Sequence, residues 1–293
     1  MTVDKEFLLP ADLSGRNVME ERIMSGNEEI EKTVLGKSIL GREIPVYRIG
    51  KGKRPVVFVA AHHALEAIGT NLLYLFLRVL SDEEEYRRLG VGILRSALLS
   101  SFSLYFVPCL NPDGAELVSG GAINSPLRER QLRMSGGDFS TWQANARGVD
   151  LNHNYDAYFY EYKRLEREKG IVPGATLYSG EYPESEPETR ALASFIRALM
   201  PTLTVSLHTQ GEEIYFSERG RRLALALAER TGYRPLRAEG TAAYGGLTDY
   251  LERMKLAALT VEMGKGKNPL PNSLLPLLAE RLLPAFAALP TLL

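Results

Sequence analysis

The clearest hydrophobic pattern in the chain is a short apolar run that stops at a cluster of polar residues. Residues 56–61 (VVFVAA) are β-branched, aromatic or small and too few for a helix, which predicts a buried strand. The run ends at His62 and His63, and Glu66 follows three residues later. Residues 69–80 are strongly apolar and of helix length. His63 and Glu66 are therefore expected at a strand-to-helix turn, where open α/β sheets bind ligands.

Two further apolar runs also end at residues that carry chemistry. Residues 203–207 lead to His208, and residues 256–261 lead to Glu262. Zinc binds imidazole nitrogen and carboxylate oxygen, and a catalytic zinc uses three protein ligands. His63 and Glu66 alone are a weak motif that a helix start with a first-turn acid explains better, but His208 supplies a third ligand. A lone acid at the end of a buried strand is costly unless it is paired or used, so Glu262 is the expected general base.

The remaining pattern predicts an α/β protein with strands and helices in alternation. Glycine-broken alternation in residues 31–50 predicts two edge strands joined by a turn, and residues 103–110 predict another strand. A capping box at residues 185–188 is expected to open a helix. Further helices are expected at residues 221–231, from residue 245 onward and at residues 274–293. We expect a single domain over residues 1–293, with an N-terminal extension at 1–30 and a core at 31–293.

Two polar segments interrupt this pattern. Asn111-Pro112-Asp113-Gly114 has the composition of a tight turn. Residues 119–148 are rich in Gly and Arg without clear periodicity, and loops of that length are usually functional. They lead into residues 145–155, where Asp, Asn, His and Arg crowd together. Either a substrate-gripping segment or a plain surface loop has this composition.

Composition restricts the class of protein. The 293 residues are 45% hydrophobic and 24% charged with a net charge of -1, which is typical of a soluble globular chain and does not favour nucleic acid or an anionic membrane as partner. No basic-then-apolar leader is seen at the start, so a cytoplasmic location is expected. The single Cys109 excludes an internal disulfide and is expected in the core. A metal site must therefore use His and carboxylate.

Taken together and in order, these motifs resemble the zinc carboxypeptidase family. The resemblance runs from about Gly36 to Pro271 and is carried by the following residues: His63-x-x-Glu66, Asn111-Pro112-Asp113-Gly114, Gly148-Val149-Asp150-Leu151-Asn152, His208 and Glu262. Within the family the chain is most similar to the bacterial γ-D-glutamyl-meso-diaminopimelate peptidase I branch, through residues 147–152, 208–215 and 262–271.

The resemblance implies a fold and a catalytic apparatus. The fold would be a three-layer α/β/α arrangement around a mixed, mostly parallel sheet of about eight strands. One zinc ion would be held by His63, Glu66 and His208, with Glu262 as general base and then proton donor. An arginine would stabilise the oxyanion. Arg147 is the expected residue, and the alternatives lie in the preceding loop: Arg128, Arg130 and Arg133.

The resemblance also implies substrate-binding residues. Asn152 occupies the position of the family's carboxylate-binding Asn, while His153 stands where the family has Arg. The family's active-site tyrosine falls on Thr241, with Tyr244 close by. Thr248 occupies the specificity-pocket position and suits a polar, zwitterionic end. The implied activity is hydrolysis of the γ-D-glutamyl-diaminopimelate bond of murein peptides. Two alternatives stay open: a general metallocarboxypeptidase for ordinary peptide C-termini, and a catalytically silent cell-wall-peptide-binding protein.

Overall fold

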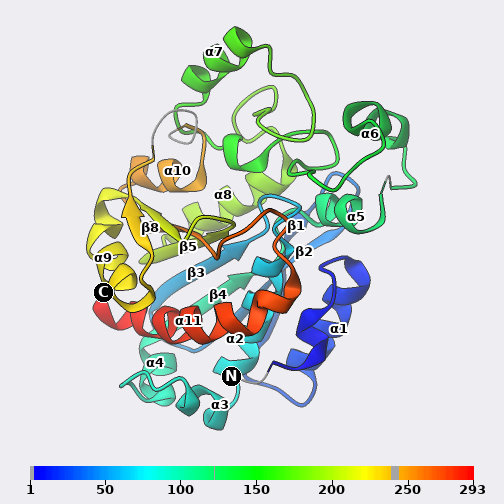
Figure 1. The fold of residues 1–293 in the computed structure, drawn as a ribbon. Coiled ribbons are helices and arrows are strands. Elements are labelled where there is room, and N and C mark those ends of the chain that lie inside the picture. Colours follow the sequence, from blue (N-terminus) through cyan, green and yellow to red (C-terminus); the bar gives the residue numbers. More distant parts are fainter. Residues whose placement is uncertain (1–2, 122, 239–243) are drawn as a thin grey trace.

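The structure is a computed structural model that describes residues 3–121, 123–238 and 244–293. Within them the chain forms one eight-stranded sheet in the order β1-β2-β4-β3-β5-β8-β6-β7 (Figure 1). The strands are β1 (Glu31–Lys37), β2 (Glu43–Ile49), β3 (Arg54–Ala60), β4 (Phe102–Val107), β5 (Leu203–His208), β6 (Glu213–Phe216), β7 (Arg234–Leu236) and β8 (Ala258–Glu262).

Helices cover both faces of this sheet. They are α1 (Leu13–Met24), α2 (Ala67–Leu80), α3 (Glu83–Arg88), α4 (Arg95–Ser101), α5 (Pro112–Gly120), α6 (Arg128–Ser135), α7 (Phe159–Lys169), α8 (Pro187–Leu199), α9 (Arg221–Thr231), α10 (Leu247–Arg253) and α11 (Leu275–Ala288).

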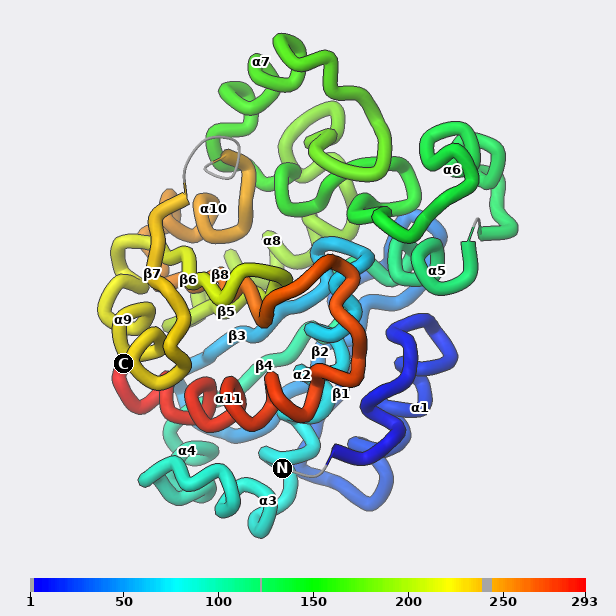
Figure 2. Tube along the Cα trace, in the orientation of Figure 1, coloured from blue at the N-terminus to red at the C-terminus, as the bar shows by residue number. Residues whose placement is uncertain are grey.

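Alternate residues of the central strands feed two apolar layers, as the period of two requires. Val56 and Phe58 belong to the larger core, which includes apolar side chains of α1, α2, α9 and α11. Val59 and Val107 belong to a second core with side chains of α8 and α10. The expected three-layer α/β/α fold is thus confirmed. In the view of Figure 2, α6 and α7 lie in the upper part, away from the strands.

Parallel pairing brings the carboxyl ends of three neighbouring strands together on the same side of the sheet. β3 pairs in parallel with β4 and β5, and β5 pairs in parallel with β8. Ala60 lies opposite Leu207, and His208 lies opposite Glu262. The antiparallel pairs are β1 with β2, β2 with β4 and β6 with β8. The sheet is therefore mixed and mostly parallel, and the residues that end β3, β5 and β8 meet.

Several local predictions are corrected by the structure. β2 is an interior strand between β1 and β4, so only β1 of that pair lies at the sheet edge. Asn111 caps a helix, with its Oδ1 accepting from the Gly114 N–H at 3.0 Å, because Pro112 fits the first helical turn. The polar segment 119–148 contains α6. The capping box at 185–188 is absent, since Glu188 is buried instead of reaching back to the cap.

The C-terminal helical region is apolar because it is part of the core. Residues Asn272–Leu292 are long and apolar enough by composition to cross a membrane, but 61% of the most apolar window is buried inside the fold. Phe286 of α11 packs against Phe58 and Phe76, with ring centroids 5.9 and 6.3 Å away. Packing on the sheet and on α2 accounts for the apolar composition of α11.

Candidate active site

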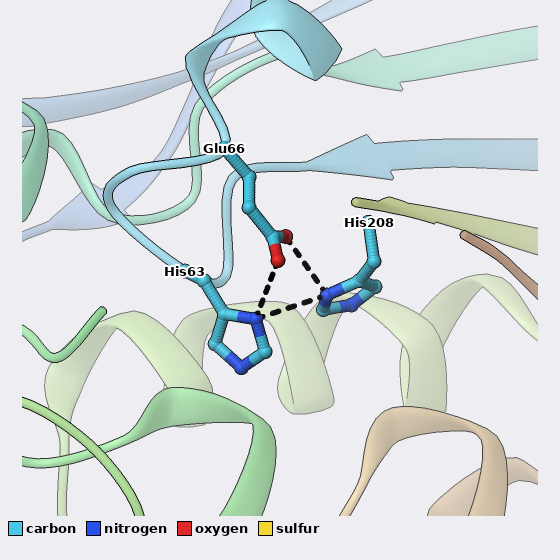
Figure 3. A group of neighbouring side chains, drawn as sticks. All are labelled: His63, Glu66 and His208. Atoms are coloured by element: carbon cyan, nitrogen blue, oxygen red, sulfur yellow. Dashed lines mark hydrogen bonds and ion pairs between the residues drawn. The ribbon is translucent and has the colours of Figure 1, made fainter. Parts of the chain in front are cut away.

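Three side chains converge where β3 and β5 end (Figure 3). His63 lies in the loop after β3, Glu66 immediately precedes α2, and His208 is the last residue of β5. His63 Nδ1 is 3.0 Å from Glu66 Oε1, and His208 Nδ1 is 3.0 Å from Glu66 Oε2. The two Nδ1 atoms are 3.3 Å apart. Strand and helix thus bring together the trio that the sequence singles out.

This cluster has the chemistry of a divalent metal site. Its candidate ligand atoms all lie within 4.8 Å of one another. Two ligands of a tetrahedral zinc at about 2.05 Å would be roughly 3.3 Å apart, which matches the facing imidazole nitrogens. Glu66 Oε2 is buried without a hydrogen bond, although His208 Nδ1 is near. The Glu66 carboxylate makes no capping hydrogen bond to α2, so a role in starting the helix does not explain this residue. The residues fit a zinc ion.

Charge pairing keeps the carboxylates of this cluster ionised. Burial opposes ionisation of Glu66, but His63 and His208 lower its pKa to about 2. Asp150 lies behind His63, with its Oδ1 3.3 Å from His63 Nε2. Burial again opposes ionisation, yet His63 holds the pKa of Asp150 well below its usual range. A carboxylate behind a ligating imidazole fixes the ring's orientation and raises its basicity.

The turn that carries His63 is held by the Asn111 motif. Ala61 adopts a φ of 54°, which turns the chain out of β3. Asn111 Nδ2 donates to the His62 carbonyl at 3.1 Å and to the Ala144 carbonyl at 3.1 Å. Asp113 accepts from Arg42 Nη1 at 2.7 Å and so ties the β1–β2 connection to the same region. The motif that looked like a plain turn therefore positions the His63 loop.

Glu262 lies beside the cluster on the neighbouring strand. It is the register partner of His208 and ends β8. Burial is the largest cause that raises its pKa, to about 7, against the opposing effect of His208. A carboxyl with a pKa near neutrality suits proton transfer in both directions. Its position and electrostatics agree with the role expected from the sequence.

Glu262 and His63 line a cavity of about 320 Å³. The wall includes Asn152, whose Oδ1 accepts from the Leu247 N–H at 3.2 Å, and Thr248, whose hydroxyl is 2.7 Å from that of Thr260. His153 also lines it, and its ring stacks on Tyr162 at 4.1 Å. Asn152, His153 and Thr248 are thus brought together with the metal-ligand cluster.

The expected oxyanion arginine is located elsewhere. Arg147 binds Glu186 through two hydrogen bonds of 3.0 Å and lines a separate cavity together with Arg130. Arg133 lies on α6 near Glu129, with 72% of its side chain exposed. Of the described residues, Arg237 is the arginine that lines the cavity of Glu262. The predicted catalytic role of Arg147 is therefore corrected. Arg147 is the ion-pair partner of the buried Glu186 and does not line the cavity of Glu262.

Tyr244, the candidate tyrosine that the structure describes, does not line this cavity. Tyr244 contributes its carbonyl oxygen, which lies 2.8 Å from His153 Nδ1, while its ring packs against Tyr158 with centroids 6.1 Å apart. Thr241 lies outside the described residues. In the described part of the chain, Tyr215 is the tyrosine on the cavity wall, and its hydroxyl donates to Glu213 at 2.8 Å.

Sequence reasoning missed three residues of this site. Asp150 belongs to the motif at residues 148–152. An acid two residues before a substrate-binding Asn could have been considered as a partner for a ligating His. Arg237 and Glu252 reach the cavity from the region after β7 and from α10. No local pattern announces these two, because only tertiary structure brings them to the wall.

The fold and the His-Glu-His cluster define an α/β protein with a candidate zinc site, and the comparisons identify its family. The chain belongs to the zinc carboxypeptidase family, which it matches over residues 17–283. It is 31% identical over 259 residues to γ-D-glutamyl-L-diamino acid endopeptidase 1 of Lysinibacillus sphaericus. That alignment covers 83% of this chain and 63% of the relative, so the chain spans less than two thirds of the relative's length.

Solved structures agree with the fold. Bovine thrombin-activatable fibrinolysis inhibitor, in complex with a tick carboxypeptidase inhibitor, superposes with a TM-score of 0.70 at 23% identity, covering 95% of this chain and 94% of that chain. Murein-tripeptide amidase from Escherichia coli O157 superposes with a TM-score of 0.55 at 22% identity, covering 89% and 91%. The family expected from the ordered motifs is confirmed.

Proposed function

We propose that this metallopeptidase hydrolyses the amide bond between γ-D-glutamate and a diamino acid such as diaminopimelate in murein-derived peptides. The observation that carries the proposal is the convergence of His63, Glu66 and His208 beside Glu262 on a polar cavity. The names of the Lysinibacillus relative and of the amidase from Escherichia coli support this choice of bond.

The chain's own residues account for the steps of such a hydrolysis. His63, Glu66 and His208 would hold one zinc ion, which supplies Lewis-acid activation of water and of the peptide carbonyl when bound. Glu262 takes a proton from the attacking water and passes it to the amine that leaves. Asp150 keeps the His63 ring oriented through its contact with Nε2. Asn152, fixed by the Leu247 N–H, presents its amide to the substrate.

The replacement of the family's arginine at His153 bears on the substrate. His153 contacts the Tyr244 carbonyl and stacks on Tyr162, so its ring is held in the cavity wall. A histidine at this position is shorter than arginine and lacks its two-pronged guanidinium, so it binds a terminal carboxylate less strongly. We infer that the cavity recognises its substrate through more contacts than the terminal carboxylate alone.

The test is a product analysis of a mixed peptide pool. Zinc-loaded protein is incubated with L-Ala-γ-D-Glu-meso-diaminopimelate and several ordinary L-peptides, and the products are identified by mass spectrometry. Release of diaminopimelate alone is the expected result. Trimming of ordinary peptides alone would identify a general carboxypeptidase, which Asn152 in the cavity also suits. An untouched pool, with Glu262→Gln no different from wild type, would point to a binding protein.

A further inference from the structure

The cavity continues past Glu262 along β8. Thr260 precedes Glu262 by two residues, so both side chains lie on one face of the strand, roughly 7 Å apart along it. Thr248 of α10 approaches from the opposite side, and the two threonine hydroxyls are 2.7 Å apart. Along β8 the threonine pair therefore lies next to Glu262, on the side away from the carboxyl end of the strand.

Two opposite charges lie beyond the threonine pair. Glu252 is four residues after Thr248 and therefore one helical turn further on the same face of α10. Arg237 follows β7 and also lines the cavity. The cavity thus runs from His63 and Glu262, past two hydroxyls, to a carboxylate and a guanidinium.

Both charged groups are held in place by other contacts. Arg237 Nη1 donates to the Phe216 carbonyl at 3.0 Å, and its guanidinium lies over the Phe216 ring with Cζ 4.7 Å from the centroid. Arg237 also pairs with Glu218. The Glu218 N–H in turn donates to Glu252 Oε2. Arg237 and Glu252 are therefore linked through Glu218.

We propose that Arg237 and Glu252 bind the zwitterionic end of the side chain of the residue that is released. Arg237 would bind its carboxylate and Glu252 its ammonium group, with the aliphatic part of the side chain lying alongside the hydrogen-bonded pair of Thr248 and Thr260. This inference rests on the proposed function, because it names how the diamino acid is selected. A wall with both charges favours a side chain that carries both, since a side chain with only one of them meets a single oppositely charged partner. Asp249, which also lines the cavity, adds a second acid on the ammonium side.

The test compares three tripeptides that share L-Ala-γ-D-Glu and differ in the third residue. The residues are meso-diaminopimelate, L-lysine, which lacks the side-chain carboxylate, and L-α-aminopimelate, which lacks the side-chain ammonium. Arg237→Gln is expected to lower kcat/KM about 10- to 100-fold for the two substrates with the carboxylate and to spare the lysine peptide. Glu252→Gln is expected to lower kcat/KM by a similar factor for the meso-diaminopimelate and lysine peptides, which carry the ammonium group, and to spare the aminopimelate peptide.

Matched controls separate recognition from general damage. Arg221→Gln removes the other arginine that pairs with Glu218, and Glu229→Gln removes an exposed acid of α9, while neither residue lines the cavity. Both are expected to match wild type. Binding of free meso-diaminopimelate to each zinc-loaded protein is measured by calorimetry, as a readout that needs no cleavage.

The outcomes distinguish this inference from the proposed function. If wild type cleaves the diaminopimelate peptide and Arg237→Gln matches Arg221→Gln in cleavage and binding, the recognition of the zwitterion is wrong and the activity stands. If wild type cleaves none of the three peptides but binds meso-diaminopimelate, and Arg237→Gln does not bind it, the recognition stands and the activity is wrong. If wild type shows neither cleavage nor binding, both the recognition and the activity are wrong.

Discussion

Glu262 is the residue whose replacement should separate catalysis from metal binding. Its carboxyl ends β8 next to His208 but is not one of the three converging ligands. Glu262→Gln should lower kcat by about 10²- to 10⁴-fold, because the amide cannot accept the proton of water. The zinc content, measured by elemental analysis, should stay at one ion per chain. Glu213→Gln is a suitable control, since Glu213 lies opposite Glu262 on β6 but binds Tyr215 and Arg234. Activity of Glu262→Gln within tenfold of this control would remove Glu262 as the base.

Asp150 should act on the metal through His63. Its carboxylate is buried and faces His63 Nε2, while its two oxygens also accept the Asn152 and Leu177 N–H groups at 3.1 Å. Asp150→Asn keeps the shape but removes the charge that orients the ligand, so zinc affinity should fall about 10- to 100-fold. Competition with a chromogenic chelator measures this. Asp156→Asn, at an exposed site in the same segment, should bind zinc like wild type. Equal affinities of the two variants would show that Asp150 does not support the ligand.

At the scale of elements, the strands that end at the site were predictable because each has an unambiguous pattern. β3, β5 and β8 are short apolar runs, and each stops at or just before a residue with metal or acid-base chemistry. Parallel strands align their carboxyl ends at one sheet edge. Two local rules were therefore enough to bring His63, His208 and Glu262 together.

The remaining site residues depend on contacts that no local pattern specifies. Arg147 was the expected oxyanion residue, with other arginines of the same polar segment as alternatives, and its pairing with the buried Glu186 decides its direction. Arg237 reaches the cavity because β7 pairs with β6. The capping box failed for the same reason: Glu188 turns away from the helix end to accept the Ile39 N–H at 3.1 Å. Tertiary partners overrode local propensity in each case.

The first turn of α8 should make stability depend on pH through Glu188. Burial is the main cause that raises its pKa to about 8, and Glu186 and Asp113 add to it. The folded state thus holds this proton more tightly than the unfolded chain. The resulting stability is fully present below the ordinary pKa of about 4.5 and is lost as pH rises through about 8.

Urea unfolding of wild type and Glu188→Gln at several pH values tests this dependence. Between pH 5 and 8 the unfolding free energy of wild type should fall by about 3 kcal/mol relative to Glu188→Gln, which has no proton to lose. Glu181→Gln, at an exposed site before α8, should show no such change relative to wild type. A difference between wild type and Glu188→Gln that does not vary with pH would mean that Glu188 ionises normally.

At the scale of the whole molecule, the site joins segments that are far apart in the chain. Its residues come from the β3–α2 turn, the segment around Asp150, the ends of β5 and β8, and α10. Glu66 and His208 are buried, and a bound cation would offset the desolvation that opposes the charge on Glu66. The metal should therefore stabilise the entire fold and not only complete the catalytic group.

Removal of zinc should lower the melting temperature of the whole domain. A ligand that binds only the folded state at about 1,000 times its Kd contributes about 4 kcal/mol, which for a chain of this size corresponds to about 5–10 °C. Calorimetry of protein treated with chelator, before and after zinc is restored, measures this shift. His153→Gln, which removes a cavity histidine outside the ligand cluster, should keep the shift. His208→Gln should abolish it, since the strand end of β5 would then offer no imidazole to the ion. Equal melting temperatures of wild type with and without zinc would mean that the cluster does not bind the metal tightly in the folded chain.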